Sequence, residues 1–141
     1  MTGLMGRWQG VQSKPKVVCD VAHNVGAWEV SLRLLYIESS QYNKVHIVLG
    51  MSKDKDIDGV LSLMPKKATY YFTQASGERA APANVMAKKG KTHELNGQIY
   101  RTVKEATEEA LRNAVENDFI LIGGSIFVVA EALPLFPDAI K

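Results

Sequence analysis

The residues that could do chemistry lie in four short polar segments, each of which directly follows an apolar run. The segments are residues 20–24, 50–56, 74–79 and 123–125. They supply carboxylates, lysines, an arginine, an imidazole and hydroxyls, groups that recognise phosphates, carboxylates and sugar hydroxyls through charge-assisted hydrogen bonds. Each segment taken alone is also compatible with an ordinary solvated loop, because exposed backbone favours polar neighbours.

Two other arrangements of reactive residues resemble known sites only in part. Residues 89–92 are Lys-Gly-Lys-Thr, like the end of a phosphate-binding P-loop, but Val85 occupies a position that needs glycine. The segment also follows a predicted helix instead of a strand, so we expect a solvated basic loop. Cys19 and His23 could form a zinc or nucleophile pair, yet no third ligand is near and Cys19 ends an apolar run. We favour a small core cysteine.

Three further residues have a local sequence context that suggests their surroundings. Ser125 follows two glycines and precedes an apolar helix, whose free N–H groups and dipole favour a carboxylate or a phosphate. His46 lies inside an apolar run, which predicts a packed or edge-strand histidine. His93 follows the basic segment and is expected in a surface loop.

The elements that must position these residues alternate along the chain. Apolar or β-branched runs predict strands over 16–19, 45–49, 68–73 and 119–122, with a short extended piece over 98–102. Helical spacing of apolar residues predicts helices over 27–35, 60–64, 84–89, 103–115 and 125–134. Such alternation predicts a Rossmann-like, three-layer α/β fold with a mostly parallel sheet flanked by helices. Ligands bind such sheets beyond the carboxyl ends of the strands, where the four polar segments begin.

Composition sets outer limits on function. The 141 residues are 46% hydrophobic and 23% charged, which predicts one domain over 1–141. A formal net charge of +2, mixed along the chain, argues against a nucleic-acid partner. The apolar stretch 119–136 is interrupted by glycine, glutamate and proline, so we expect a strand and a helix there, not a membrane span. The absence of a signal-peptide pattern predicts a cytoplasmic location.

Four motifs in order resemble one family. They are Gly6-Arg7-Trp8-Gln9, Asp20-Val21-Ala22-His23-Asn24, Gly50-Met51 with Asp54-Lys55-Asp56, and Gly123-Gly124-Ser125 before an apolar helix. From Thr2 to about Leu135, the chain is similar to the C-terminal, glutamate-ligase domain of folylpolyglutamate and dihydrofolate synthases, in the Mur ligase superfamily. The resemblance implies that an N-terminal P-loop ATPase domain is absent from this chain and is its partner. Met1 is then expected to be an added start, and the fragment alone is expected to be inactive.

The resemblance also implies a reaction. Ligases of this kind add L-glutamate to folate or dihydropteroate through an acyl phosphate, in folate biosynthesis and one-carbon metabolism. ATP and Mg²⁺ are expected to be held mainly by the absent domain, and no metal ligand is assigned to this chain. Two alternatives stay open: the C-terminal domain of another Mur-type amino-acid ligase, and a free-standing nucleotide or amino-acid binding module.

Residue roles follow from the same resemblance. Arg7 would reach the ATP phosphates across the cleft between domains, and Asp20 would accept hydrogen bonds from the ribose hydroxyls. The sequence departs from the family pattern at Gln9, where glutamate is also found, and at Val25, where proline is frequent.

The remaining assigned residues concern the second substrate. His23, assigned as catalytic, and Asn24 would face the acyl phosphate and the incoming glutamate. Lys55 would pair with one glutamate carboxylate, although Lys53 could align in its place, and Ser125 would hold another.

Overall fold

The computed structural model describes residues 7–140, without the side chain of Ile140; Met1, Thr2 and Gly6 lie outside the described residues. Its strands are β1 (Gln9–Ser13), β2 (Lys16–Asp20), β3 (Val45–Leu49), β4 (Thr69–Phe72), β5 (Asn96–Ile99) and β6 (Phe119–Gly123). Its α-helices are α1 (Val25–Ser39), α2 (Ile57–Leu61), α3 (Ala83–Thr92), α4 (Val103–Asn113) and α5 (Ile126–Ala132). Two 3₁₀ turns, Leu133–Leu135 and Pro137–Ile140, follow α5.

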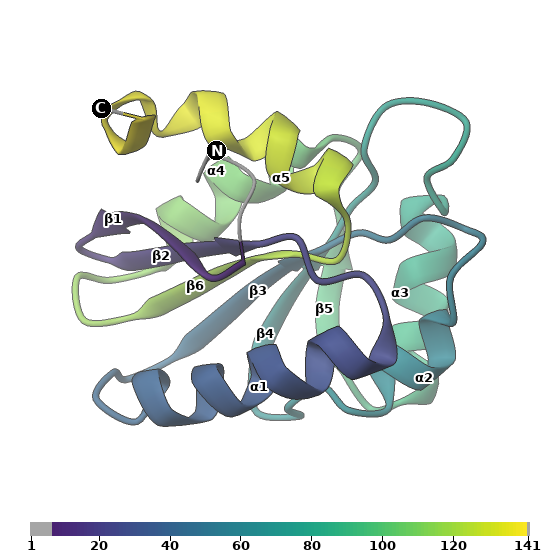
Figure 1. Cartoon of the computed structure of the whole chain (residues 1–141), viewed down its shortest axis with the longest axis horizontal. Helices are drawn as coiled ribbons and strands as arrows, with labels where there is room; N and C mark the ends of the chain where they lie inside the picture. Colours follow the sequence, from purple (N-terminus) through teal and green to yellow (C-terminus); the bar gives the residue numbers. More distant parts are fainter. Residues whose placement is uncertain (1–6, 141) are drawn as a thin grey trace.

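The strands form one sheet in the order β1-β2-β6-β3-β4-β5, in which only the β1–β2 pair is antiparallel. Helices α1, α2 and α3 cover one face, and α4 and α5 cover the other (Figure 1). Trp28 of α1 is fully buried on the first face, and Val129 of α5 is fully buried on the second. The predicted α/β fold, with a mostly parallel sheet between two helical layers, is confirmed.

Two local predictions missed the structure. Strand β1 was not expected, because its only large apolar side chain is Val11 and pairing with β2 holds it in the sheet.

Residues 89–92 were expected to be a loop but complete α3, so that interpretation is wrong. A Cβ on Gly90 would lie 2.4 Å from Cζ of Phe72, so the glycine lets α3 pack directly on β4.

The apolar stretch near the C-terminus forms β6, α5 and a 3₁₀ turn, as the strand-and-helix prediction requires. Across residues 7–140, no helix has both the length and the apolar character that crossing a bilayer demands. His93 is the C-cap of α3, where its Nε2 lies 2.9 Å from Oδ1 of Asp58 on α2. It is therefore a helix-end residue in contact with a neighbouring helix, not a free loop residue.

A buried polar cluster lies beside α4. His46 is 4% exposed in the central strand β3, so it is a packed histidine and not an edge one. Its Nδ1 is 2.9 Å from the Tyr71 hydroxyl, and its Nε2 is 2.9 Å from Oδ2 of Asp118. Asp118 also accepts hydrogen bonds from the backbone N–H groups of Val115 and Lys44. Burial acts to raise the pKa of Asp118, but these hydrogen bonds hold it below its ordinary value.

Replacing this carboxylate tests the cluster. We expect Asp118→Asn to lower the free energy of unfolding at neutral pH by about 1–3 kcal/mol, since it weakens bonds to buried donors. A carboxyl whose pKa is lower in the folded state stabilises above its unfolded value of about 4, and that stabilisation is lost as pH falls through the folded value. The difference in unfolding free energy between the natural chain and the variant therefore becomes smaller in acid. Urea denaturation across a pH series measures this difference. Exposed Glu116→Gln is the matched control; a difference that does not depend on pH would contradict the charge argument.

Candidate functional site

The carboxyl ends of four parallel strands are aligned, which brings the polar segments to one edge of the sheet. Gly123 of β6 pairs with Asp20 of β2 on one side and with Leu49 of β3 on the other, and Leu49 pairs with Phe72 of β4. After β6 the chain turns to α5 on one face, whereas β2 and β3 lead to helices on the opposite face. The loops therefore diverge on both sides of β6, the topology that opens a crevice in α/β sheets.

Ser125 is fixed at this crevice by a close backbone approach. Gly124 has φ of +108°, and a Cβ there would lie 2.2 Å from the carbonyl oxygen of Gly50. Ser125 follows as the N-cap of α5, where its Oγ accepts hydrogen bonds from Phe127 N at 2.9 Å and Val128 N at 3.3 Å. Two of the N–H groups at this helix start, which were expected to be free for a ligand, are thus occupied by Ser125 itself. The hydroxyl proton of Ser125 can still be donated.

The loops after β3 and β4 are joined to each other. Lys53 N donates to Arg79 O at 2.8 Å, and Ala81 N donates to Met51 O at 2.9 Å, on either side of a bridge between Ser52 and Ala80. These bonds involve only backbone atoms, so they hold the loops together whatever the side chain at position 79.

The first half of the loop after β4 is held to α5. The Glu131 carboxylate accepts from Ser76 N at 2.8 Å and from Ser76 Oγ at 2.7 Å. The loop is thus fixed near both of its ends, to α5 and to the loop after β3.

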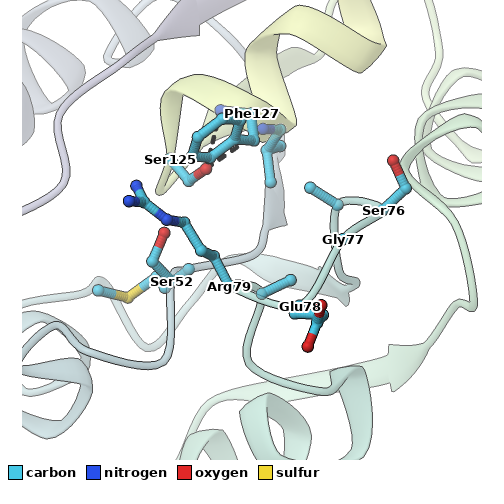
Figure 2. A pocket seen from close by; sticks show the side chains of 11 residues that line it. Ser52, Ser76, Gly77, Glu78, Arg79, Ser125 and Phe127 are labelled. Atoms are coloured by element: carbon cyan, nitrogen blue, oxygen red, sulfur yellow. Dashed lines mark hydrogen bonds between the residues drawn. The ribbon is translucent and has the colours of Figure 1, made fainter.

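A hollow of two adjoining lobes lies between these loops and α5. The outer lobe, about 200 Å³, is lined by His23, Ser52, Asp54, Lys55, Arg79, Ser125, Ile126 and Phe127. The inner lobe, about 130 Å³, shares Ser52, Arg79, Ser125 and Phe127 and adds Met51, Ala75, Ser76, Gly77, Glu78, Ala80 and Val128 (Figure 2). The structure thus brings together three of the predicted site residues, His23, Lys55 and Ser125. Lys53 is exposed and lines neither lobe, which favours Lys55 of the two lysines.

Arg7 and Asp20 form a separate cluster on β2. Arg7 Nε donates to Asp20 Oδ1 at 2.8 Å, and its Nη2 donates to Ser31 Oγ at 2.8 Å and Ala27 O at 2.9 Å. The Ser31 hydroxyl donates to Asp20 Oδ2, and Ala22 N donates to Oδ1 at 3.1 Å. The Asp20 side chain is fully buried, whereas that of Arg7 is 42% exposed. Both carboxylate oxygens thus have protein donors, as a buried charge requires.

His23 and Asn24 are exposed on the turn between β2 and α1. The Asn24 Oδ1 accepts from Ala27 N at 2.8 Å and caps α1, so the residue has a structural role and lines neither lobe of the hollow. His23 Nδ1 lies 3.2 Å from the Val21 carbonyl oxygen. That contact assigns the proton to Nδ1, because a carbonyl only accepts, and leaves Nε2 for a ligand.

The thiol of Cys19 is buried in the core between β2, α4 and α5. Burial, with a smaller contribution from the Asp20 charge, raises the pKa of Cys19 to about 12. A thiol that stays protonated neither attacks nor binds zinc readily, which supports the core interpretation. Within residues 7–140, His, Cys, Asp and Glu nowhere gather in a group of three that could hold a metal ion.

Arg79 is the site residue that sequence analysis missed. It was placed in a polar segment but given no role, because its position in the hollow depends on pairing between loops that are distant in sequence. Its side chain is exposed, and within the described part of the chain it forms no ion pair. The sequence signal was only an arginine after a buried strand.

Comparison with known proteins agrees with this architecture. The chain is 31% identical over 134 residues to a dihydrofolate synthase/folylpolyglutamate synthase of Buchnera aphidicola subsp. Schizaphis graminum, covering 94% of this chain and 31% of that protein. It superposes on Escherichia coli FolC in complex with DHPP and ADP with a TM-score of 0.85 and 29% identity, over 96% of this chain and 32% of that one. A bifunctional folylpolyglutamate synthase/dihydrofolate synthase with Mn, AMPPNP and L-glutamate bound gives a TM-score of 0.78 at 29% identity, over 92% and 31%.

The chain spans about a third of the length of these relatives. Residues 6–126 match the model of a family described as the Mur ligase, glutamate ligase domain. That match covers most of the chain, including all six strands and the loops that form the hollow. The chain therefore belongs to the Mur ligase glutamate ligase domain family.

Proposed function

We propose that this chain is the glutamate-binding, cleft-closing part of an ATP-dependent ligase that adds L-glutamate to folate or dihydropteroate. The observation that carries the proposal is the similarity, over 94% of the chain, to a dihydrofolate synthase/folylpolyglutamate synthase. A structurally similar protein with L-glutamate and AMPPNP bound supports the same substrates here. The partner is an N-terminal P-loop domain of the same parent chain, which supplies the phosphate-binding machinery.

The proposed reaction has two steps. A carboxylate oxygen of the folate or pteroate attacks the γ-phosphorus of ATP, ADP leaves, and an acyl phosphate forms. The amine nitrogen of glutamate then attacks the acyl carbon, inorganic phosphate leaves, an amide bond forms and a proton is released. Similar proteins contain Mn with a nucleotide. Since the described residues form no metal-binding group, we assign the divalent ion to the partner domain.

Arg7 and Asp20 suit the nucleotide because their chemistry matches its two polar parts. Arg7 uses Nε and Nη2 in its contacts with the domain, which leaves Nη1 to donate to a phosphate oxygen. A carboxylate only accepts and therefore suits a ribose diol. Because Asp20 is fully buried and bonded to Arg7, ribose binding requires Arg7 Nε to release Asp20 Oδ1, after which Nε can join Nη1 in donating to phosphate.

The hollow suits the incoming amino acid. Lys55 supplies a cation for one carboxylate, and the hydroxyl of Ser125 can donate to another. His23 lines the outer lobe, where we place the reacting amine and acyl phosphate, and its Nδ1 contact with Val21 leaves Nε2 for them. Asn24 acts indirectly by capping α1 and fixing the turn that carries His23, while its amide group remains able to donate.

The proposal is tested on the full-length natural protein that contains this domain. We expect ADP and phosphate release that depends on both L-glutamate and dihydropteroate or a folate, with one glutamate incorporated per ATP. The isolated 141-residue chain is expected to release none. Release that requires a different amino acid or acceptor would point to another Mur-type ligase and overturn the folate assignment.

In the full-length enzyme, Arg7→Ala should lower turnover. We expect a loss equivalent to roughly 2–4 kcal/mol of transition-state stabilisation, the range for losing one charge-stabilising donor. Steady-state kinetics give this value, and Arg33→Ala, an exposed arginine on α1, is the matched control. Turnover near that of the natural enzyme would remove Arg7 from the phosphate site.

Asp20→Asn preserves the shape of the side chain but not its charge. We expect KM for ATP to rise by about 10- to 100-fold, because hydrogen bonds to a charged group are worth about 1.5–3 kcal/mol. Ser31→Ala is the comparison, since it removes a protein donor to Asp20 and keeps the carboxylate. An unchanged KM for ATP in Asp20→Asn would refute the ribose assignment.

A further inference from the structure

We propose that Arg79 is a specificity-determining residue that pairs with the side-chain carboxylate of the incoming amino acid. The inference rests on the proposed function and names a contact that sequence analysis did not assign. It concerns the inner lobe of the hollow, where none of the residues given roles by the sequence supplies a charge.

The position of Arg79 is the first support. It lines both lobes, as do Ser52 and Ser125, so it lies where the two lobes meet. Figure 2 shows its guanidinium extending toward the side of Ser52 and Ser125, while Glu78 next to it points the other way. The backbone bond from Lys53 N to Arg79 O fixes the base of the side chain at this junction.

Charge is the second support. The residues lining the outer lobe include two cations, Lys55 and Arg79, and one carboxylate, Asp54. Within residues 7–140 no salt bridge neutralises any of the three. A dicarboxylic amino acid with a free amine carries two negative charges and one positive charge, which is the complement of these three outer-lobe residues. A second carboxylate, Glu78, lines the inner lobe, but it points away from the Arg79 guanidinium (Figure 2).

The order of residues along the hollow decides which carboxylate Arg79 takes. His23 and Lys55 line the outer lobe only, so the reacting amine and the α-carboxylate beside it belong there. Part of the inner lobe is formed by Met51, Ala75 and Val128, apolar surfaces that suit the methylene groups of a side chain. A side chain that extends inward from the α-carbon then brings its terminal carboxylate to Arg79.

This arrangement explains how the site would distinguish a carboxylate from a neutral group of the same shape. A guanidinium offers a carboxylate two parallel N–H···O bonds, whereas an amide presents one acceptor and an opposing NH₂. Because Arg79 is exposed, solvent weakens the effect, and we expect discrimination of about 10- to 100-fold from this contact.

The test uses the full-length enzyme and compares kcat/KM for L-glutamate with kcat/KM for L-glutamine, its neutral analogue. Arg79→Ala should lower kcat/KM for glutamate by about 10- to 100-fold, mainly through KM, and leave that for glutamine nearly unchanged. Arg79→Lys keeps the charge without the paired donors, so its kcat/KM for glutamate should lie between those of the natural enzyme and Arg79→Ala. KM for ATP should stay the same in both variants.

Arg33→Ala on α1 is the control for loss of a surface arginine, and thermal unfolding verifies that each variant is folded. If Arg79→Ala keeps the glutamate preference, or loses both substrates equally, the assignment of Arg79 to the side-chain carboxylate is overturned. If the natural enzyme incorporates no glutamate, and its Arg33→Ala and Arg79→Ala variants do not differ from it in activity, the proposed function has failed. This inference then fails with it.

Discussion

The close approach of two backbones at the carboxyl edge of the sheet is the constraint on which the site depends. Gly124 in its left-handed conformation lies against the carbonyl of Gly50, so the loops after β6 and β3 meet without side chains between them. That contact is possible because β6 is hydrogen-bonded between β2 and β3 along its full length. The hollow and the first turn of α5 are therefore extensions of the most deeply buried strand.

The two halves of the site are built on opposite electrostatic principles. At β2, Asp20 is buried and accepts hydrogen bonds from three separate parts of the chain, residues 7, 22 and 31. Residue 7, an arginine, also supplies the opposite charge. In the hollow, Lys55 and Arg79 are left without protein partners among the described residues. The first arrangement pairs a buried charge internally, and the second keeps charge available in solvent. In the function proposed above, a ligand competes with protein groups at β2 and with water in the hollow.

Sequence predicted the parts of the fold that depend on local pattern. Strands β2, β3, β4 and β6 are apolar runs whose burial on both faces leaves little choice of structure. Strand β1 has one large apolar side chain and becomes a strand by pairing with β2, which no local pattern reveals. Residues 89–92 were expected to be a loop, because the Phe72 ring against which Gly90 packs is distant in sequence.

The site shows the same division between local and long-range information. The position of His23 follows from a strand end and a helix cap that are visible in the sequence. The pairing of Arg7 with Asp20 joins residues 13 positions apart, and the lining of the hollow, which includes Lys55 and not Lys53, comes from the folded structure. Arg79 needed knowledge of the bridge between two loops, a tertiary contact with no sequence signature.

The double attachment of the loop after β4 has a consequence for the thermodynamics of recognition. Glu131 fixes one end of this loop through Ser76, and the bridge between Ser52 and Ala80 fixes the other. A loop held in this way has given up its conformational entropy during folding, before any ligand arrives. In the contact proposed for Arg79, the backbone is already ordered, and only the rotamers of the arginine side chain remain to be restricted on binding.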